Sequence, residues 1–318
     1  MKIKSVSSFK DQQGAARFFE EWVNKISALS GTVYDRLDVE TALGNTVVWG
    51  INTGRTDLKT IVIFPGFRTS SLFWDMDNAL APLKNDYRIY LVETNGQPNL
   101  SDGNTPDIKG NGYGIWANEV LEKLSLEKAI IAGASFGGLV CLKLCIINPG
   151  RVEKAILLNP GCLQSFSLSW KNLYYNLLPL LLPNQKNVER FLDKAVFYQD
   201  IHIVSHAAKK LIADYELFAI RNYRDRTQKP YAMSKQELEK TETDVYLILG
   251  DKDILFPCEK SLSIARKHIR NLRGVHIIPG TGHGIETSKK AIEVLSLIAE
   301  TTENPLKQVK ERSMNTGL

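Results

Sequence analysis

The chain has 318 residues, 43% of them hydrophobic and 24% charged, a composition typical of a globular protein with one large α/β domain or two small ones. Its 40 basic and 35 acidic residues are interspersed and leave a net charge of only +5, which argues against a nucleic-acid partner. The most apolar stretch, residues 173–183, is about half as long as a membrane-spanning helix and contains Pro179, so we expect no membrane span.

The first predicted element is an amphipathic helix within residues 1–30, where Phe18, Phe19, Trp22 and Ile26 recur at helical spacing. The residues before it lack the apolar run and the cleavage site of a secretory signal. The cysteines form no Cys-x-x-Cys pair, which predicts buried free thiols and a cytoplasmic protein. They are Cys141, Cys145, Cys162 and Cys258.

Eight runs of strand character follow this helix, and from the third run onward they are short, almost wholly apolar and mostly separated by helical segments. Continuous apolarity predicts burial on both faces, and alternation with helices predicts a doubly wound, mostly parallel sheet. The first two runs lack an intervening helix and are expected to form an antiparallel edge. The runs are residues 32–40, 45–52, 60–66, 87–93, 128–135, 153–161, 244–251 and 274–280.

A long segment without strand character, residues 162–243, interrupts this alternation and is too long for a loop. We predict a helical cap inserted into an α/β core made of residues 31–161 and 244–302, followed by a polar tail at 303–318. The cap would lie over the carboxyl ends of the strands, where open α/β sheets bind ligands. Its stretch "SWKNLYYNLLPLLLP" either packs between helices or lines an apolar pocket.

The most informative motif is "GASFG" at residues 133–137, which lies between an apolar strand and an apolar helix. In that context Gly-x-Ser-x-Gly forms a strained turn that presents the serine hydroxyl, so Ser135 is the candidate nucleophile. The glycines do not have the spacing of a dinucleotide-binding loop, and no Gly-Lys-Ser/Thr ending of a phosphate-binding loop is present. A turn without function is the remaining alternative.

Candidates for the base and the acid follow the last two predicted strands. His283 is the only one of the five histidines in a glycine-flanked loop directly after a strand, and we take it as the base. Asp253 is the candidate acid, while nearby Asp251 is the less favoured choice and is expected to form a turn. Two backbone N–H groups must also stabilise an oxyanion, and we expect them from Phe136, directly after the serine, and Phe67, in the loop "PGFRTSS".

With these motifs in this order, residues 34–300 resemble the α/β-hydrolase superfamily, in the branch with a helical cap after the sixth strand. The resemblance rests on "FPGFRTSSLFW", "GASFGG", "NPGRVEKAILLNP", "GDKDILFP" and "GTGHG". It implies a triad of Ser135, Asp253 and His283 with oxyanion donors Phe67 and Phe136. The sequence departs from the family at Pro65, where a histidine is usual, and in the loop "ETNGQPNLSDG", which has only a loose likeness to the family's glycine-rich loop.

Serine as the nucleophile favours an acyl-enzyme mechanism, because relatives that open epoxides or remove halide use aspartate there. The sequence therefore predicts a cofactor-independent serine hydrolase that cleaves a small or medium carboxylic ester or thioester, its small-molecule partner. One alternative is a ligand-binding, receptor-like protein of the same fold, with slow turnover or none. The other is an acyltransferase that uses an alcohol or amine in place of water.

Overall fold

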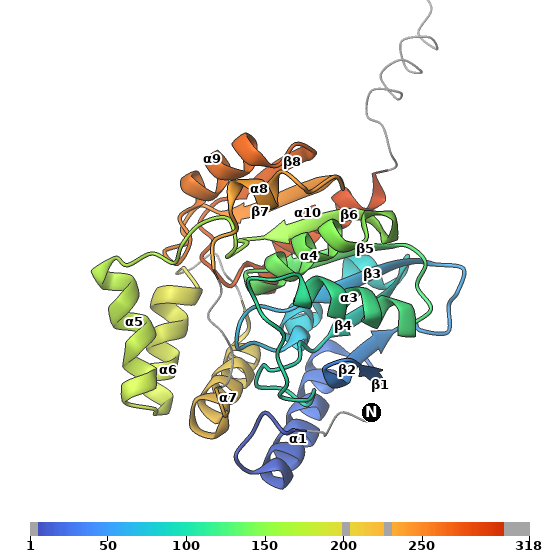
Figure 1. The fold of residues 1–318 in the computed structure, drawn as a ribbon. Helices are drawn as coiled ribbons and strands as arrows, with labels where there is room; N and C mark the ends of the chain where they lie inside the picture. The colour runs from blue at the N-terminus through green and yellow to red at the C-terminus, as the bar shows by residue number, and fades with distance from the viewer. Residues whose placement is uncertain (1–5, 199–203, 226–230, 302–318) are drawn as a thin grey trace, which may run out of the picture.

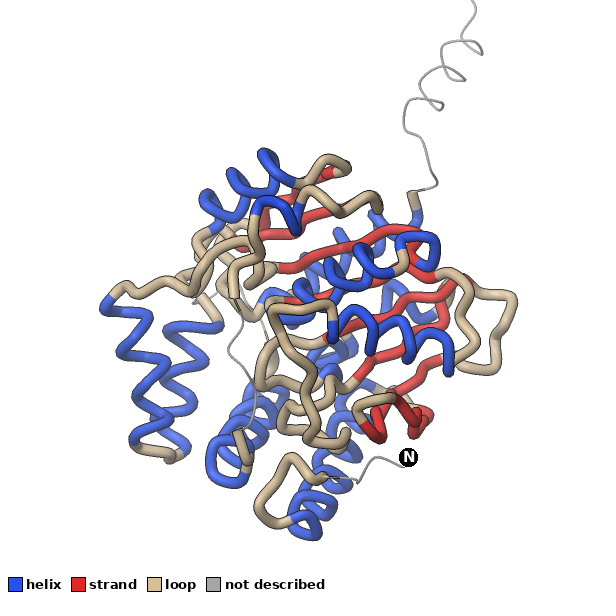
Figure 2. The backbone as a smooth tube through the Cα atoms, viewed as in Figure 1, coloured by secondary structure: helices blue, strands red, loops and turns tan. Residues whose placement is uncertain are grey.

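The computed structural model describes residues 6–198, 204–225 and 231–301 (Figure 1). An eight-stranded sheet runs through this part of the chain, with helices packed on both of its faces (Figure 2). The predicted polar tail, residues 303–318, lies outside the described residues. Within those ranges, no helix combines the length and the apolarity that crossing a bilayer requires.

The strand order is β1-β2-β4-β3-β5-β6-β7-β8. The β1–β2 and β2–β4 pairs are antiparallel, and the remaining pairs are parallel. This arrangement confirms the predicted mostly parallel sheet with an antiparallel edge. The strands are β1 (Asp35–Thr41), β2 (Gly44–Ile51), β3 (Lys59–Phe64), β4 (Tyr87–Val92), β5 (Ala129–Ala134), β6 (Val152–Leu158), β7 (Val245–Gly250) and β8 (Leu272–Ile278).

Alternate residues of the central strands enter two separate hydrophobic clusters, one on each face of the sheet. In β3, Ile61 and Ile63 belong to one cluster, whereas Val62 and Phe64 belong to the other. Burial on both faces explains why these strands are apolar throughout. One face carries α3 (Gly112–Lys123), α4 (Phe136–Ile147) and α9 (Cys258–His268), and the other carries α1 (Gln12–Ser30), the short α2 (Ala81–Lys84) and α10 (Lys289–Glu300).

The segment between β6 and β7 contains helices, as its composition predicts. In Figure 1, α5 and α6 form a pair that projects from the body of the protein, while α7 lies beside α1. The role of this segment as a cap stays a prediction. Its elements are α5 (Trp170–Leu181), α6 (Gln185–Phe191), a π-helical turn (Leu192–Val196), α7 (His206–Asn222) and α8 (Lys235–Leu238).

The N-terminal helix packs against α7 through aromatic side chains. The rings of Phe18 and Phe218 stack with their centroids 3.9 Å apart. The indole N–H of Trp22 donates to the Leu211 carbonyl oxygen at 2.9 Å. The apolar stripe of α1 therefore covers part of the protein's own structure.

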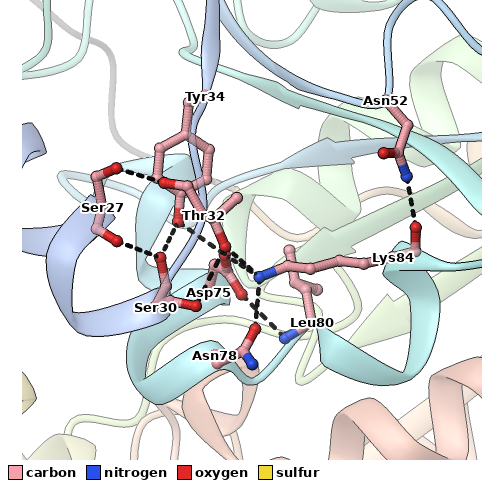
Figure 3. Close-up of polar contacts among 9 residues, drawn as sticks. All are labelled: Ser27, Ser30, Thr32, Tyr34, Asn52, Asp75, Asn78, Leu80 and Lys84. Carbon is pink, nitrogen blue, oxygen red and sulfur yellow. Dashed lines mark hydrogen bonds and ion pairs between the residues drawn. The ribbon is translucent and has the colours of Figure 1, made fainter.

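A buried carboxylate, Asp75, joins the end of α1 to the loop after β3 (Figure 3). Its Oδ2 accepts hydrogen bonds from the Tyr34 hydroxyl at 2.7 Å and the Thr32 hydroxyl at 3.1 Å, and it pairs with Lys84 Nζ at 2.7 Å. Its Oδ1 accepts from the Leu80 N–H at 3.1 Å. Burial and the neighbouring carboxylate raise the pKa of the Tyr34 hydroxyl, which therefore remains a donor.

Replacing this carboxylate should destabilise the fold strongly. In Asp75→Ala, Lys84 loses its ion-pair partner and three further donors lose their acceptor, so we expect the free energy of unfolding to fall by about 3–5 kcal/mol. Urea unfolding at neutral pH measures the change. Asp57→Ala is the control, because Asp57 and Arg55 form an exposed pair, and it should leave the midpoint nearly unchanged. Equal midpoints for the two variants would contradict this assignment.

Candidate active site

Ser135 occupies the turn between β5 and α4, with φ 49° and ψ −108°, a conformation that costs a non-glycine residue energy. Its N–H donates to the Leu158 carbonyl oxygen, at the end of β6, at 2.9 Å. The helix begins directly at Phe136. Ser135 thus lies at the carboxyl edge of the sheet and at the N-terminus of a helix.

Close backbone contacts explain both glycines of the motif. A Cβ on Gly133 would lie 2.3 Å from the carbonyl oxygen of Gly137, and a Cβ on Gly137 would lie 2.1 Å from the carbonyl oxygen of Phe64. Real Cβ atoms do not approach backbone atoms so closely. The helix after the serine can therefore pack against β3 only because these residues have no side chain.

His283 and Asp253 form a hydrogen-bonded pair, with His283 Nδ1 2.8 Å from Asp253 Oδ2. The other carboxylate oxygen of Asp253 accepts the N–H groups of Leu255 at 2.8 Å and Phe256 at 3.0 Å. The Asp253 side chain is fully buried, and that of His283 is 12% exposed. The Oδ2 atom of Asp251 instead lies 3.4 Å from Lys252 Nζ, in an ion pair that is more exposed. Of the two aspartates, Asp253 is the one that contacts the histidine.

The surroundings of His283 act on its pKa in opposite directions. Burial lowers the pKa, while the charge of Asp253, its hydrogen bond and the charge of Glu286 raise it. The net effect is a pKa above the ordinary value of 6.5. Asp253 therefore favours the protonated form of the His283 imidazole.

The two candidate oxyanion donors are neighbours. The rings of Phe67 and Phe136 meet edge to face with centroids 5.9 Å apart. A Cβ on Gly66 would lie 3.6 Å from the Cβ of Ser135, so the loop after β3 approaches the serine closely. The Phe67 N–H has no backbone acceptor among the described residues, and the Phe136 N–H is the first of α4, where N–H groups lack partners within the helix.

Comparison with known proteins identifies the family. The alpha/beta hydrolase fold family matches residues 59–285, most of the chain. The chain belongs to this family. It is 25% identical over 246 residues to the uncharacterized carboxylesterase nap of Bacillus subtilis (strain 168), covering 77% of this chain and 79% of that protein.

Another relative and one solved structure agree with this assignment. Carboxylesterase YbfK of Bacillus subtilis (strain 168) is 22% identical over 283 residues, which is 88% of this chain and 92% of that protein. The crystal structure of naproxen esterase (carboxylesterase NP) from Bacillus subtilis superposes with a TM-score of 0.76 at 22% identity, covering 91% of this chain and 99% of that one. The structural likeness establishes the alpha/beta hydrolase fold.

This alpha/beta hydrolase holds the loop after β3 with two residues that the sequence did not single out, Gln97 and Glu93. The Arg68 N–H donates to Gln97 Oε1 at 2.8 Å. The Ser70 hydroxyl donates to Glu93 Oε1 at 2.5 Å, and the Ser71 N–H donates to Glu93 Oε2 at 3.3 Å. Both supporting residues lie in "ETNGQPNLSDG", the loop that departs from the family pattern.

The burial of Glu93 is unusual for a carboxyl group and raises its pKa to about 7, despite the hydrogen bonds from Ser70 and Ser71 that favour the charged form. Glu93 directly follows β4, so its position was available in the sequence as a carboxylate at the carboxyl end of a parallel strand. That position was the only signal, because the partners of Glu93 lie more than twenty residues away.

Asn159, which directly follows β6, was also missed and connects the end of β7 with the loop that carries His283, the candidate base. Its Nδ2 donates to the carbonyl oxygens of Gly282 at 2.9 Å and His283 at 3.2 Å. Its Oδ1 accepts the N–H of Gly250, at the end of β7, at 2.8 Å. Asn159 also has a positive φ of 39°, so its backbone is strained. Its place at a strand end was its only signal in the sequence.

The loop after β6 and the loop after β7 meet beside the serine. The ring of Phe256 lies 5.4 Å, centroid to centroid, from that of His283. A Cβ on Gly161 would lie 3.1 Å from Phe256 Cζ and 3.4 Å from Ser135 Oγ. Gly161 therefore lies between the serine hydroxyl and the ring of Phe256, which in turn contacts His283.

Removing the Asn159 side chain should misplace His283 without unfolding the protein. In Asn159→Ala we expect kcat for ester hydrolysis to fall on the order of 10–100-fold with little change in KM, because small errors in the position of a catalytic group are costly. Asn148→Ala is the control, since the Asn148 amide donates at 2.9 Å to Asn118, in a contact between helix α3 and the end of α4. Equal activity of the Asn159 variant and wild type would refute the positioning role.

Proposed function

We propose that this alpha/beta hydrolase is a serine hydrolase that cleaves carboxylic esters through an acyl-enzyme at Ser135. The observation that carries the proposal is the 2.8 Å hydrogen bond between buried Asp253 and His283, which follow strands of the same parallel sheet whose carboxyl edge holds the strained turn of Ser135. A paired acid and base next to a presented hydroxyl is the arrangement that activates a weak nucleophile.

The contacts assign a role to each group. Because Nδ1 of His283 is engaged by Asp253, the Nε2 atom is left to take the proton of Ser135 as its Oγ attacks the ester carbonyl. The N–H groups of Phe67 and Phe136 stabilise the oxyanion. His283 then returns the proton to the leaving alcohol. In the second half of the reaction His283 takes a proton from water, which attacks the acyl-enzyme, and the proton passes to Ser135 Oγ as the carboxylic acid leaves.

The relatives support the choice of bond. Two carry the name carboxylesterase, and one of the similar structures is a naproxen esterase. We extend this to the present chain as hydrolysis of small or medium carboxylic esters, with thioesters as chemically equivalent acyl donors. The helices between β6 and β7 are proposed as the cap that selects among these substrates.

Two other functions compete with hydrolysis. Pro65 is the only sequence feature that favours a receptor-like protein, and the loop that follows it is supported by hydrogen bonds that Arg68 and Ser70 donate to Gln97 and Glu93. An acyltransferase would use the same acyl-enzyme, and product analysis with an added alcohol or amine separates it from a hydrolase. A cytoplasmic location is proposed because all four cysteines are free and buried.

An activated serine should be detectable directly. We expect a fluorophosphonate to add once to the wild-type protein, not at all to Ser135→Ala and on the order of 10³-fold more slowly to His283→Ala, because only an adjacent base makes serine a good nucleophile. Intact-mass spectrometry measures the adduct, and turnover of a short-chain nitrophenyl ester should disappear in parallel. Ser165→Ala, at an exposed loop serine, is the control. Unchanged ester turnover in Ser135→Ala would refute the proposal.

The pH dependence should report the ionisation of His283. A protonated imidazole cannot accept the serine proton, so kcat/KM for an uncharged ester should increase with pH and reach a plateau, with a midpoint above 6.5 because Asp253 raises the histidine pKa. Asp253→Asn should lower this midpoint and reduce kcat on the order of 10⁴-fold. Rates measured from about pH 5 to 9 test this. A flat profile would show that His283 is not the base.

A further inference from the structure

The outer side of α5 carries a stripe of exposed apolar side chains. Trp170, Tyr174, Leu177 and Leu181 follow each other at intervals of four, three and four residues, so they share one face of the helix. Their exposed fractions are 82%, 44%, 48% and 75%. The two interpretations of this stretch from sequence, packing between helices and lining a pocket, therefore do not describe these four residues.

Neighbouring residues enlarge the stripe. Leu168 before the helix is 75% exposed, and Leu182 after it is 59% exposed. Buried Asn172 and Pro179 lie on the side of α5 that packs against the rest of the chain. In Figure 1, α5 forms the outer edge of the projecting α5–α6 pair. Contiguous exposed apolar surface of this kind marks an interaction site.

The charged residues in the sequence around α5 have one sign. The chain has no aspartate or glutamate between residues 162 and 188, although 35 acidic residues occur in the whole sequence. Lys171 and Lys186 lie within this range, and both are exposed. The surface thus combines tryptophan, tyrosine and leucine with positive charge, the composition of helices that lie in the headgroup region of anionic membranes.

We propose that the stripe of α5 docks on an anionic lipid surface, with Trp170 and Tyr174 at the headgroup level and Leu177 and Leu181 in the acyl region. A second copy of the chain is a poorer fit. A 12-residue helix is about 18 Å long and about 10 Å wide, so its face covers roughly a quarter of the ~800 Å² per partner in a standard interface. A lipid surface needs no such complementary area.

The residues directly before α5 contact the loop after β7, which carries Asp253. The Ser167 N–H donates to the Leu255 carbonyl oxygen at 2.9 Å. The Phe166 ring meets the Phe256 ring with centroids 6.0 Å apart, and Phe256 in turn contacts His283. Docking would hold the loop after β7 close to the lipid, where apolar esters concentrate. This last step rests on the proposed function, whereas the docking itself does not.

Trp170 gives the docking a direct spectroscopic signal. It is exposed, whereas the other four tryptophans, Trp22, Trp49, Trp74 and Trp116, are at most 6% exposed. Adding vesicles of phosphatidylglycerol and phosphatidylcholine to the full chain should therefore shift the tryptophan emission to shorter wavelength, and Trp170→Phe should abolish the shift. Cosedimentation with the same vesicles measures the partition coefficient. Using Ser135→Ala throughout keeps docking separate from catalysis.

The variant Leu177→Ser/Leu181→Ser should lower the partition coefficient roughly a hundredfold, because two leucines no longer leave water. Leu297→Ser is the matched control, since Leu297 is 63% exposed on α10, and it should bind like the parent. Vesicles of phosphatidylcholine alone, or high salt, should reduce binding.

Several results would overturn the proposal: no binding to the anionic vesicles, equal binding to neutral vesicles, or a dimer that the double leucine variant dissociates. The last result would assign the stripe to a second copy of the chain. Failure of docking with intact ester hydrolysis in the wild-type protein would reject this inference and keep the proposed function. Docking without ester hydrolysis in the wild-type protein would keep this inference and reject the proposed function.

Discussion

The close approach of α4 to β3 is the constraint on which the candidate site depends. Gly137 lies so near the Phe64 carbonyl oxygen that any side chain would collide with it. This contact joins the strained turn of Ser135 to β3, and Gly66, two residues after Phe64, lies beside the serine. The candidate nucleophile and a candidate oxyanion donor therefore lie in segments joined by the same packing contact.

The parallel sheet supplies the remaining groups. Parallel strands end at one edge, so the loops after β3, β4, β5, β6 and β7 meet there although they are far apart in sequence. Asn159 and Asp253 follow β6 and β7, and each hydrogen-bonds to His283. The position of the histidine after β8 is thus set by neighbours on adjacent strands.

Much of this arrangement was predictable because it depends on local patterns. Apolar runs between helices gave the strands, and Gly-x-Ser-x-Gly between an apolar strand and an apolar helix gave the turn of Ser135. Gln97, Glu93 and Asn159 were not found because their roles depend on side-chain contacts across 22 to 124 residues of sequence. Periodicity predicts which side chains of a helix share a face, but it does not say whether that face meets protein or solvent. The outward direction of the α5 stripe therefore required the structure.

The inserted segment also contacts the loop after β4 through α7. The hydroxyl of Tyr215, in α7, donates to the Pro98 carbonyl oxygen, and the hydroxyl of Tyr223, directly after α7, donates to the Gly96 carbonyl oxygen. Pro98 and Gly96 lie on either side of Gln97. Gln97 in turn accepts the Arg68 N–H, next to Phe67. Since α7 packs on α1, the N-terminal helix is connected through α7 and the 96–98 backbone to the loop of Phe67, the candidate oxyanion donor. The helices of the insertion thus divide into two parts: α7 braces the loop after β3, whereas α5 turns its apolar face outward.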